Sequence, residues 1–240
     1  MIQGETNEPI IILAGGFGTR LKSELGNLPK ALADINGKPF LELFLNNLVT
    51  NGFRNFVFSL HYKSQQIIDF LERYKENIGL ECNFEYVVEP KAMGTGGAVA
   101  YVISRLGLKN ELFVINSDTW IGSGHQDIYL DKYNTIGLIE MDDCQRYGKV
   151  ITDSDGFIVE FREKDSIASR GWINSGIYRL EASLFYDWNG DPFSMEKSLF
   201  QFLVENRQLK GVKLHTTFTD IGIPEDYEKF KKEWKGYLED

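Results

Sequence analysis

The chain is poor in the residues that build disulfides, metal clusters and covalent catalytic centres. Its two cysteines, Cys82 and Cys144, lie far apart in a chain of 240 residues and lack the close spacing of a metal site. We therefore expect both to be reduced packing residues in a cytoplasmic protein. His61, His125 and His215 are scattered, and we expect them to be structural or surface residues. No Ser/His/Asp or Cys/His arrangement indicates a protein nucleophile.

Long apolar segments and an excess of positive charge are also missing. No apolar stretch reaches the roughly twenty residues that span a bilayer. Residues 1–8, which we expect to be a short N-terminal extension, are polar and acidic and unlike a secretory signal. Acidic residues outnumber basic ones by 35 to 26, which gives a formal net charge of −9. Because such a surface repels polyanions, we expect neither nucleic acid nor membrane as a partner.

The most informative feature present is a glycine-rich loop directly after an apolar run at residues 10–12. Residues 13–21 read Leu-Ala-Gly-Gly-Phe-Gly-Thr-Arg-Leu, and Pro29-Lys30 follow. Glycines have no Cβ, so their backbone N–H groups can approach phosphate oxygens closely. Arg20 and Lys30 add local positive charge to an acidic protein. We interpret this segment as a cradle for a nucleoside triphosphate.

Two common phosphate loops do not fit this spacing. A Walker A loop would close on Gly-Lys-Ser/Thr, which is missing here. A dinucleotide fingerprint needs a third glycine that opens a helix, which is also missing. A glycine turn after a strand is common, so the four residues 15–18 alone are weak evidence for a phosphate site.

Strand and helix patterns alternate in the first half of the chain, and strands dominate the second. Apolar runs predict strands over 10–12, 56–60, 84–88, 112–115, 136–141, 149–152, 157–161 and 173–180. Helical spacing predicts helices over 40–48, 64–74, 96–106, 195–205 and 224–234. We expect a single three-layer α/β domain over 1–240, with a Rossmann-like, mixed and mostly parallel sheet whose ligands gather at the carboxyl ends of the strands.

Two aspartates are candidate ligands for a cation. Asp118 follows the apolar run 112–115 and should project from a strand end, where Mg²⁺ favours one or two carboxylates. A strand-end aspartate is more often a cap or turn residue, so the position alone leaves both roles open. Asp220 precedes a Gly and a Pro and an acidic first turn, which is a helix-start signal. Both roles of Asp220 are compatible.

The loop and several later segments resemble the sugar-1-phosphate nucleotidylyltransferases. Residues 15–21 with Pro29-Lys30 resemble that family's G-G-x-G-T-R-L and P-K signature, and the likeness runs from about residue 10 to 230. Residues 116–118 resemble its N-G-D segment, with Ser117 for glycine, and 220–227 its D-I-G-T-P-E-D-Y segment, with Ile223 for threonine. The resemblance implies a nucleotide-diphospho-sugar transferase fold without a C-terminal β-helix, and Mg²⁺ held by Asp118 and Asp220.

The resemblance also implies which residues bind the nucleotide. Residues 89–98 resemble the family's E-P-x-x-L-G-T-G/A-G-A segment, which lies beside the base and ribose. Arg20 and Lys30 are implied as the catalytic cations. The implied nucleotide-binding residues are Leu13, Ala14, Gly15, Gly16, Gly18, Thr19, Glu89, Gly94 and Thr95.

The sugar side rests on three shorter likenesses, to R-Y-G at 146–148, E-K at 163–164 and N-x-G-I-Y at 174–178. They imply that Gly148, Glu163 and Asn174 bind sugar hydroxyls and that Lys164 binds the sugar phosphate. The alternatives are an exposed charged turn at 163–164 and a turn role for Asn174. The proline usual after this lysine is replaced by Asp165.

The implied reaction joins an NTP and a sugar 1-phosphate into an NDP-sugar and pyrophosphate. Within the family the segments look most like the D-glycero-D-manno-heptose 1-phosphate guanylyltransferases, which make GDP-heptose for surface polysaccharide. GTP is therefore the favoured nucleotide. Mannose 1-phosphate guanylyltransferase and N-acetylmuramate 1-phosphate uridylyltransferase are the runners-up, and self-association into a homo-oligomer is left open.

Two alternatives come from other classes of protein. An inactive nucleotide-sensing subunit is disfavoured because Arg20, Lys30, Asp118 and Asp220 are all present. A glycosyltransferase of related fold is disfavoured because residues 117–120 read Ser-Asp-Thr-Trp and not Asp-x-Asp.

Overall fold

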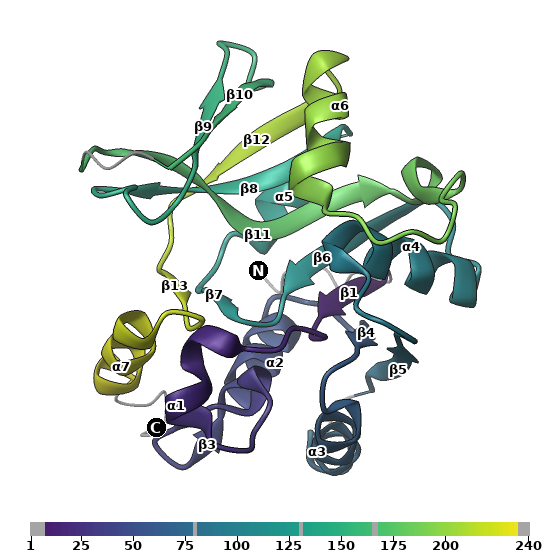
Figure 1. Ribbon diagram of the computed structural model, residues 1–240, viewed down its shortest axis with the longest axis vertical. Coiled ribbons are helices and arrows are strands. Elements are labelled where there is room, and N and C mark those ends of the chain that lie inside the picture. Colours follow the sequence, from purple (N-terminus) through teal and green to yellow (C-terminus); the bar gives the residue numbers. More distant parts are fainter. Residues whose placement is uncertain (1–7, 79–80, 130–131, 165–167, 235–240) are drawn as a thin grey trace. The chain divides into compact units, whose positions relative to one another are not determined.

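The computed structural model describes residues 8–78, 81–129, 132–164 and 168–234, and the N-terminal extension except Glu8, as well as Asp165, lies outside these ranges. The chain divides into two compact units (Figure 1). The first unit comprises Met1–Ala92, Asn116–Trp120 and Thr219–Asp240, and the second comprises Met93–Ile115 and Ile121–Phe218. The single-domain expectation stays a prediction beside this division.

A parallel sheet forms the centre of the first unit. Strands β1 (Ile10–Leu13), β4 (Asn55–Leu60) and β5 (Asn83–Val88) pair in parallel, in the order β1-β4-β5. The crossover helices are α2 (Phe40–Thr50) and α3 (Ser64–Asn77). Residues 10–12 are fully buried, which explains why a strand of a parallel sheet reads as a continuous apolar run.

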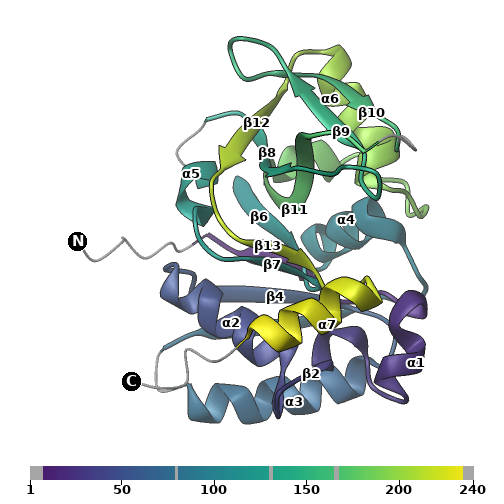
Figure 2. The same cartoon turned by 90° about the vertical axis from the view of Figure 1, so that its left-hand side faces the viewer.

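Short elements complete the first unit around these strands. They are η1 (Thr19–Leu21), α1 (Lys22–Leu25), η2 (Lys30–Leu32), the hairpin of β2 (Asp34–Ile35) and β3 (Lys38–Pro39), and α7 (Pro224–Glu233). Figure 2 shows α7 in yellow beside α2. Phe230 of α7 packs against Phe40 and Trp120 with ring centroids 5.7 and 5.5 Å apart, and the Tyr227 hydroxyl donates to the Asp34 carbonyl at 2.6 Å. These contacts tie the C-terminal segment to the N-terminal one.

The second unit has a mixed sheet built around β11 (Gly171–Glu181). This strand is antiparallel to β6 (Glu111–Asn116), β8 (Asn134–Met141) and β9 (Lys149–Thr152). Strand β10 (Ile158–Arg162) is antiparallel to β9, and β12 (Leu209–Leu214) is parallel to β8. A hydrogen bond closes the turn between β9 and β10, in which Gly156 donates its N–H to the Asp153 carbonyl at 3.1 Å.

Helices of the second unit are α4 (Gly94–Leu106), α5 (His125–Tyr129), η3 (Ala182–Phe185), the π-helical turn η4 (Met195–Leu199) and α6 (Phe200–Glu205). The helix predicted over 195–205 is therefore two consecutive segments. Among the described residues, no helix has the length and apolar content that crossing a bilayer requires. Cys82 and Cys144 are both buried and neither forms a disulfide, as predicted.

The α/β class with a mixed sheet is confirmed, with parallel pairing of β1, β4 and β5 in the first unit and of β8 with β12 in the second. Several short elements were not predicted, among them β12 and the pair of β7 (Thr119–Ile121) with β13 (Phe218–Asp220). In β12 the Lys-Gly-Val-Lys interior interrupts the apolar pattern. The three-residue strands β7 and β13 are shorter than any periodicity signal.

Candidate active site

The glycine loop begins where β1 is held between two neighbouring chain segments. Ala14 donates its N–H to the Ser59 carbonyl at 2.9 Å, and the Leu13 carbonyl accepts from the Ser117 N–H at 3.2 Å. Gly18 has a φ of +60°, a left-handed conformation that glycine adopts without strain. Leu21 is fully buried, so it anchors the far end of the loop. The backbone of the loop is therefore fixed at both ends.

Glu89 lies against the start of this loop. It is buried, and its Oε1 accepts a hydrogen bond from the Ser59 hydroxyl at 2.9 Å. A Cβ on Gly15 would lie 3.0 Å from Glu89 Oε1 and 3.1 Å from His61 Cβ, which explains the glycine at this position. At Gly16, no described atom lies within 4 Å of an added Cβ. One side of the loop is thus packed on Glu89, and Gly16 is exposed.

Three predicted charged residues of the first unit meet at one point. Lys30 Nζ lies 2.5 Å from Asp118 Oδ2 and 3.9 Å from Asp220 Oδ1. The side chains are 13%, 32% and 17% exposed in that order, so the cluster is largely screened from water. Ile221 donates its N–H to the Asp118 carbonyl at 2.9 Å, which holds the two aspartate segments together. We call Lys30, Asp118 and Asp220 the charged centre.

The two aspartates of the charged centre repel each other. Burial raises the pKa of Asp220 above the ordinary aspartate value, and the nearby charge of Asp118 raises it further. Lys30, the Gly222 N–H at 2.8 Å and the charge of Arg20 oppose this rise. Two carboxylates that repel each other thus share one ammonium group. Arg20, although exposed, acts on the same centre.

Two glycines leave room for the Lys30 side chain. A Cβ on Gly222 would lie 2.0 Å from Lys30 Nζ and 2.7 Å from Asp220 Oδ1. A Cβ on Gly18 would lie 3.2 Å from Lys30 Cβ. Gly222 was not among the predicted site residues, although its place two residues after Asp220 is the signal that points to it. Among the described residues, no group of three or more His, Cys, Asp or Glu side chains forms a metal-type cluster.

In the second unit, Gly94 and Thr95 begin helix α4. Gly94 is exposed and has a φ of +71°, and a Cβ there would lie 2.5 Å from the Phe193 carbonyl oxygen. The Thr95 hydroxyl donates to Glu196 Oε2 at 2.7 Å and accepts from the Met195 N–H at 2.9 Å. The side chain of Thr95 is therefore engaged within the protein, and Phe193 and Glu196 are partners that the sequence analysis did not assign.

Strand register brings three of the predicted sugar-binding residues together. Lys149 pairs with Arg162 on one side and with Ile173 on the other, in both cases antiparallel. Gly148, which precedes Lys149, is thus flanked by Glu163, which follows Arg162, and by Asn174, which follows Ile173. A Cβ on Gly148 would lie 2.8 Å from the Arg162 carbonyl oxygen. We call Gly148, Glu163, Lys164 and Asn174 the sugar edge.

The side chains of the sugar edge differ in their engagement. Glu163 and Lys164 are exposed, directly after β10. Asn174 Oδ1 accepts from the Gly176 N–H at 2.9 Å and Asn174 Nδ2 donates to the Tyr178 hydroxyl at 3.0 Å, where the pairing of β11 with β8 is irregular. Asn174 thus makes local hydrogen bonds of the kind that its alternative role, a turn residue, requires.

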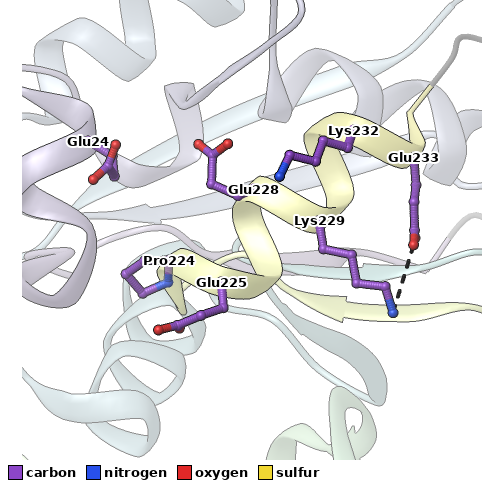
Figure 3. Close-up of a pocket in the computed structure, with 7 residues that line it drawn as sticks. All are labelled: Glu24, Pro224, Glu225, Glu228, Lys229, Lys232 and Glu233. Carbon is purple, nitrogen blue, oxygen red and sulfur yellow. Dashed lines mark ion pairs between the residues drawn. The ribbon is translucent and has the colours of Figure 1, made fainter.

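A surface groove of the first unit does not match the expected substrate. Figure 3 shows it along α7 and marks the ion pair of Lys229 with Glu233. Lys229 Nζ lies 3.9 Å from Glu233 Oε1. Its lining residues are Glu24, Pro224, Glu225, Glu228, Lys229, Lys232 and Glu233. Carboxylates outnumber ammonium groups among them, so the groove has the wrong sign of charge for a triphosphate.

Comparison with known proteins identifies the family. Residues 10–235 match the family model described as nucleotidyl transferase. The D-glycero-alpha-D-manno-heptose 1-phosphate guanylyltransferase of Campylobacter jejuni is 36% identical, over 92% of this chain and 97% of the relative. The enzyme of the same name from Aneurinibacillus thermoaerophilus is 32% identical, over 95% and 99%.

Solved structures agree with the sequence relatives. The crystal structure of HddC from Yersinia pseudotuberculosis has a TM-score of 0.83 and 34% identity, covering 95% of this chain and 100% of that one. HddC complexed with GMP-PN has a TM-score of 0.81 and 33% identity, with the same coverage. The fold, the phosphate-loop sequence and these matches lead to one conclusion: the chain belongs to the nucleotidyl transferase family.

Proposed function

We propose that this protein makes GDP-D-glycero-D-manno-heptose and pyrophosphate from GTP and D-glycero-α-D-manno-heptose 1-phosphate. Two bacterial relatives at 36% and 32% identity carry the name of this activity. A third related protein, HddC, has been crystallised with GMP-PN. Buried cysteines that form no disulfide further support a cytoplasmic setting for the reaction.

The observation that carries the proposal is the charged centre. Asp118 and Asp220 come from segments about a hundred residues apart, and both face the ammonium group of Lys30, at 2.5 and 3.9 Å. Carboxylate oxygens around a cation position fit Mg²⁺, which binds to one or two carboxylates and to substrate phosphates. When bound there, Mg²⁺ would neutralise charge on the triphosphate and on the pyrophosphate that leaves.

The residues of the first unit then have separate tasks. Backbone N–H groups of the glycine loop bind phosphate oxygens, because the exposed Gly16 leaves that face open. Arg20 is exposed beside the charged centre and binds the β- and γ-phosphates through its planar fork. Lys30 keeps the two carboxylates in place and adds positive charge to the centre. Together these groups hold the α-phosphate in a fixed orientation.

The chemical step needs no nucleophile from the protein. A phosphate oxygen of the sugar 1-phosphate attacks the α-phosphorus of GTP, and the bond from that phosphorus to the bridging oxygen of the β-phosphate breaks. Pyrophosphate leaves with the bonding electrons. At the sugar edge, Lys164 binds the attacking phosphate, and Glu163 and Asn174 bind hydroxyl groups, which need both donors and acceptors.

A substrate matrix tests this proposal. The purified protein is incubated with Mg²⁺, one of GTP, UTP, CTP, dTTP or ATP, and heptose, mannose or N-acetylmuramate 1-phosphate, and pyrophosphate release is measured. We expect the highest kcat/KM for GTP with heptose 1-phosphate. GTP with mannose 1-phosphate would reassign the sugar, and UTP with N-acetylmuramate 1-phosphate alone would overturn both assignments.

A further inference from the structure

The segment Phe193–Lys197 packs against the start of helix α4 and is hydrogen-bonded to its backbone. The Phe193 carbonyl accepts hydrogen bonds from the N–H groups of Gly96 at 3.0 Å and Gly97 at 3.2 Å, and the Phe193 N–H donates to the Met93 carbonyl at 3.0 Å. The Phe193 ring occupies the space above Gly96, where a Cβ would lie 2.1 Å from a ring carbon. The first turn of α4 therefore depends on a segment about a hundred residues later in the chain.

The carboxylate of Glu196 adds side-chain hydrogen bonds to these backbone contacts. Glu196 Oε2 accepts from the Thr95 hydroxyl at 2.7 Å and from the Ser194 hydroxyl at 2.5 Å. The two hydroxyl oxygens in turn accept backbone N–H groups, Thr95 from Met195 at 2.9 Å and Ser194 from Lys197 at 3.3 Å. Each hydroxyl has one proton, and both protons point to the same carboxylate oxygen. The network is complete only with an acceptor of this kind at position 196.

This arrangement changes what the start of α4 can bind. The N–H groups of Gly96 and Gly97 already donate to Phe193, so they are not available for a phosphate. Gly94 remains exposed, in a left-handed conformation whose Cβ position lies 2.5 Å from the Phe193 carbonyl oxygen. The segment Phe193–Lys197 thus fixes the backbone conformation of Gly94 and the orientation of the Thr95 side chain. The exposed Gly94 has no side chain and therefore presents backbone N–H and C=O groups, which suit recognition of a base edge.

We propose that Glu196 is a positioning residue that sets affinity and selectivity for the nucleotide base without touching the nucleotide. The proposal rests on the proposed function and on the resemblance of residues 89–98 to the family segment that lies beside the base and ribose. Backbone groups that read a base must stand within hydrogen-bonding distance of it, because a shifted loop leaves buried polar groups unpaired. The cations that act on the triphosphate are Arg20 and Lys30 of the first unit. Loss of Glu196 therefore raises KM for GTP and leaves kcat nearly unchanged.

The test compares Glu196→Ala with Glu196→Gln and with Glu205→Ala. Glu205 is an exposed glutamate at the end of α6, in the same helical stretch, and serves as the matched control. Loss of a hydrogen bond to a charged group predicts that Glu196→Ala raises KM for GTP about tenfold, at a kcat within about twofold of wild type. We expect preference for GTP over ATP to fall to a similar extent. The amide oxygen of Glu196→Gln still accepts both hydroxyls and restores most of the affinity.

A second variant and a binding measurement complete the experiment. Thr95→Val removes the hydroxyl from the other side, so the double variant Thr95→Val/Glu196→Ala should bind GTP no more weakly than the weaker single variant. Calorimetric titration with GTP gives this affinity without turnover. A KM, kcat and GTP preference of Glu196→Ala equal to those of Glu205→Ala would overturn the role of Glu196 while leaving the proposed function intact. A parallel loss of kcat and melting temperature with unchanged KM would also overturn it. A wild-type protein that neither binds nor turns over any NTP would overturn both.

Discussion

The charged centre of the first unit and the sugar edge of the second are built in opposite ways. In the charged centre, side chains from three distant segments face one another, and their exposures are 13%, 32% and 17%. At the sugar edge, register aligns Gly148, Glu163 and Asn174, but the side chains of Glu163 and Lys164 are exposed. The charged centre is therefore assembled within the protein, whereas Glu163 and Lys164 of the sugar edge are left exposed.

This difference fits the roles that we propose for the two sites. Charge that develops in a transition state is stabilised best by groups that are already in place, because no reorganisation is then needed during the reaction. Asp220 shows what this arrangement costs the protein, since burial and Asp118 raise its pKa. The proposed role of the sugar edge, which is to bind one ground-state ligand, needs less preorganisation. Substitutions in the charged centre should therefore affect the rate, and substitutions at the sugar edge should affect substrate affinity.

The largest effect is expected for Asp118→Asn. The change removes the carboxylate 2.5 Å from Lys30 Nζ and one of two candidate Mg²⁺ ligands. Loss of a charged group at the reaction centre predicts a fall in kcat of about 10²–10³-fold. Pyrophosphate release measures it, and a thermal melt close to that of wild type serves as the control for folding. A kcat within a few-fold of wild type would separate the charged centre from catalysis.

Arg20→Ala should have the next largest effect. Arg20 is exposed, so its removal should leave the melting temperature nearly unchanged. In the proposed mechanism its guanidinium stabilises the departing pyrophosphate, so we expect a loss of about 10²-fold in kcat/KM. Arg20→Lys should recover part of this rate, because it restores the charge without the bidentate geometry. Near-normal turnover by Arg20→Ala would remove Arg20 from the mechanism.

Lys164→Met at the sugar edge should act on affinity. Removing the ammonium group predicts a rise of about tenfold in KM for any sugar 1-phosphate, with KM for GTP unchanged. The exposed Lys213→Met is a matched control from the same unit. Initial rates over a matrix of both substrate concentrations separate the two KM values. An unchanged KM for the sugar phosphate would favour the alternative interpretation of residues 163–164 as an exposed charged turn.

The smallest effect concerns stability at Asp220. The pKa of Asp220 is raised in the folded state, so the folded protein still holds this proton at a pH where the unfolded chain has lost it. The resulting penalty to the free energy of folding grows as the pH rises between the two pKa values, and it is complete above the folded-state pKa. Asp220→Asn removes the penalty, and its melting temperature should exceed that of wild type at pH 7.5. The difference should shrink as the pH falls towards the ordinary aspartate pKa. The account would be contradicted if the melting temperature of the variant minus that of wild type were smaller at pH 7.5 than at pH 4.

The sequence predicted most of what depends on local pattern. Buried strands such as β1 and amphipathic helices such as α3 appear in the residues themselves, and both were predicted within a few residues. Candidate site residues followed from motif resemblance. The contact of Thr95 with Glu196 spans 101 residues and has no local signature. The same holds for β12, whose partner strand β8 lies about seventy residues earlier.

The dependence of pyrophosphate release on Mg²⁺ tests the central claim most directly, which is that Asp118 and Asp220 hold the cation that the reaction needs. Wild type and Asp118→Asn are stripped with EDTA and titrated with Mg²⁺ in the presence of GTP and heptose 1-phosphate. The account predicts that stripped wild type is inactive and recovers fully with Mg²⁺, and that Asp118→Asn needs at least about tenfold more Mg²⁺ for half of its own maximal rate. A wild-type rate that EDTA leaves unchanged, or an Asp118→Asn titration that coincides with wild type, would contradict the account.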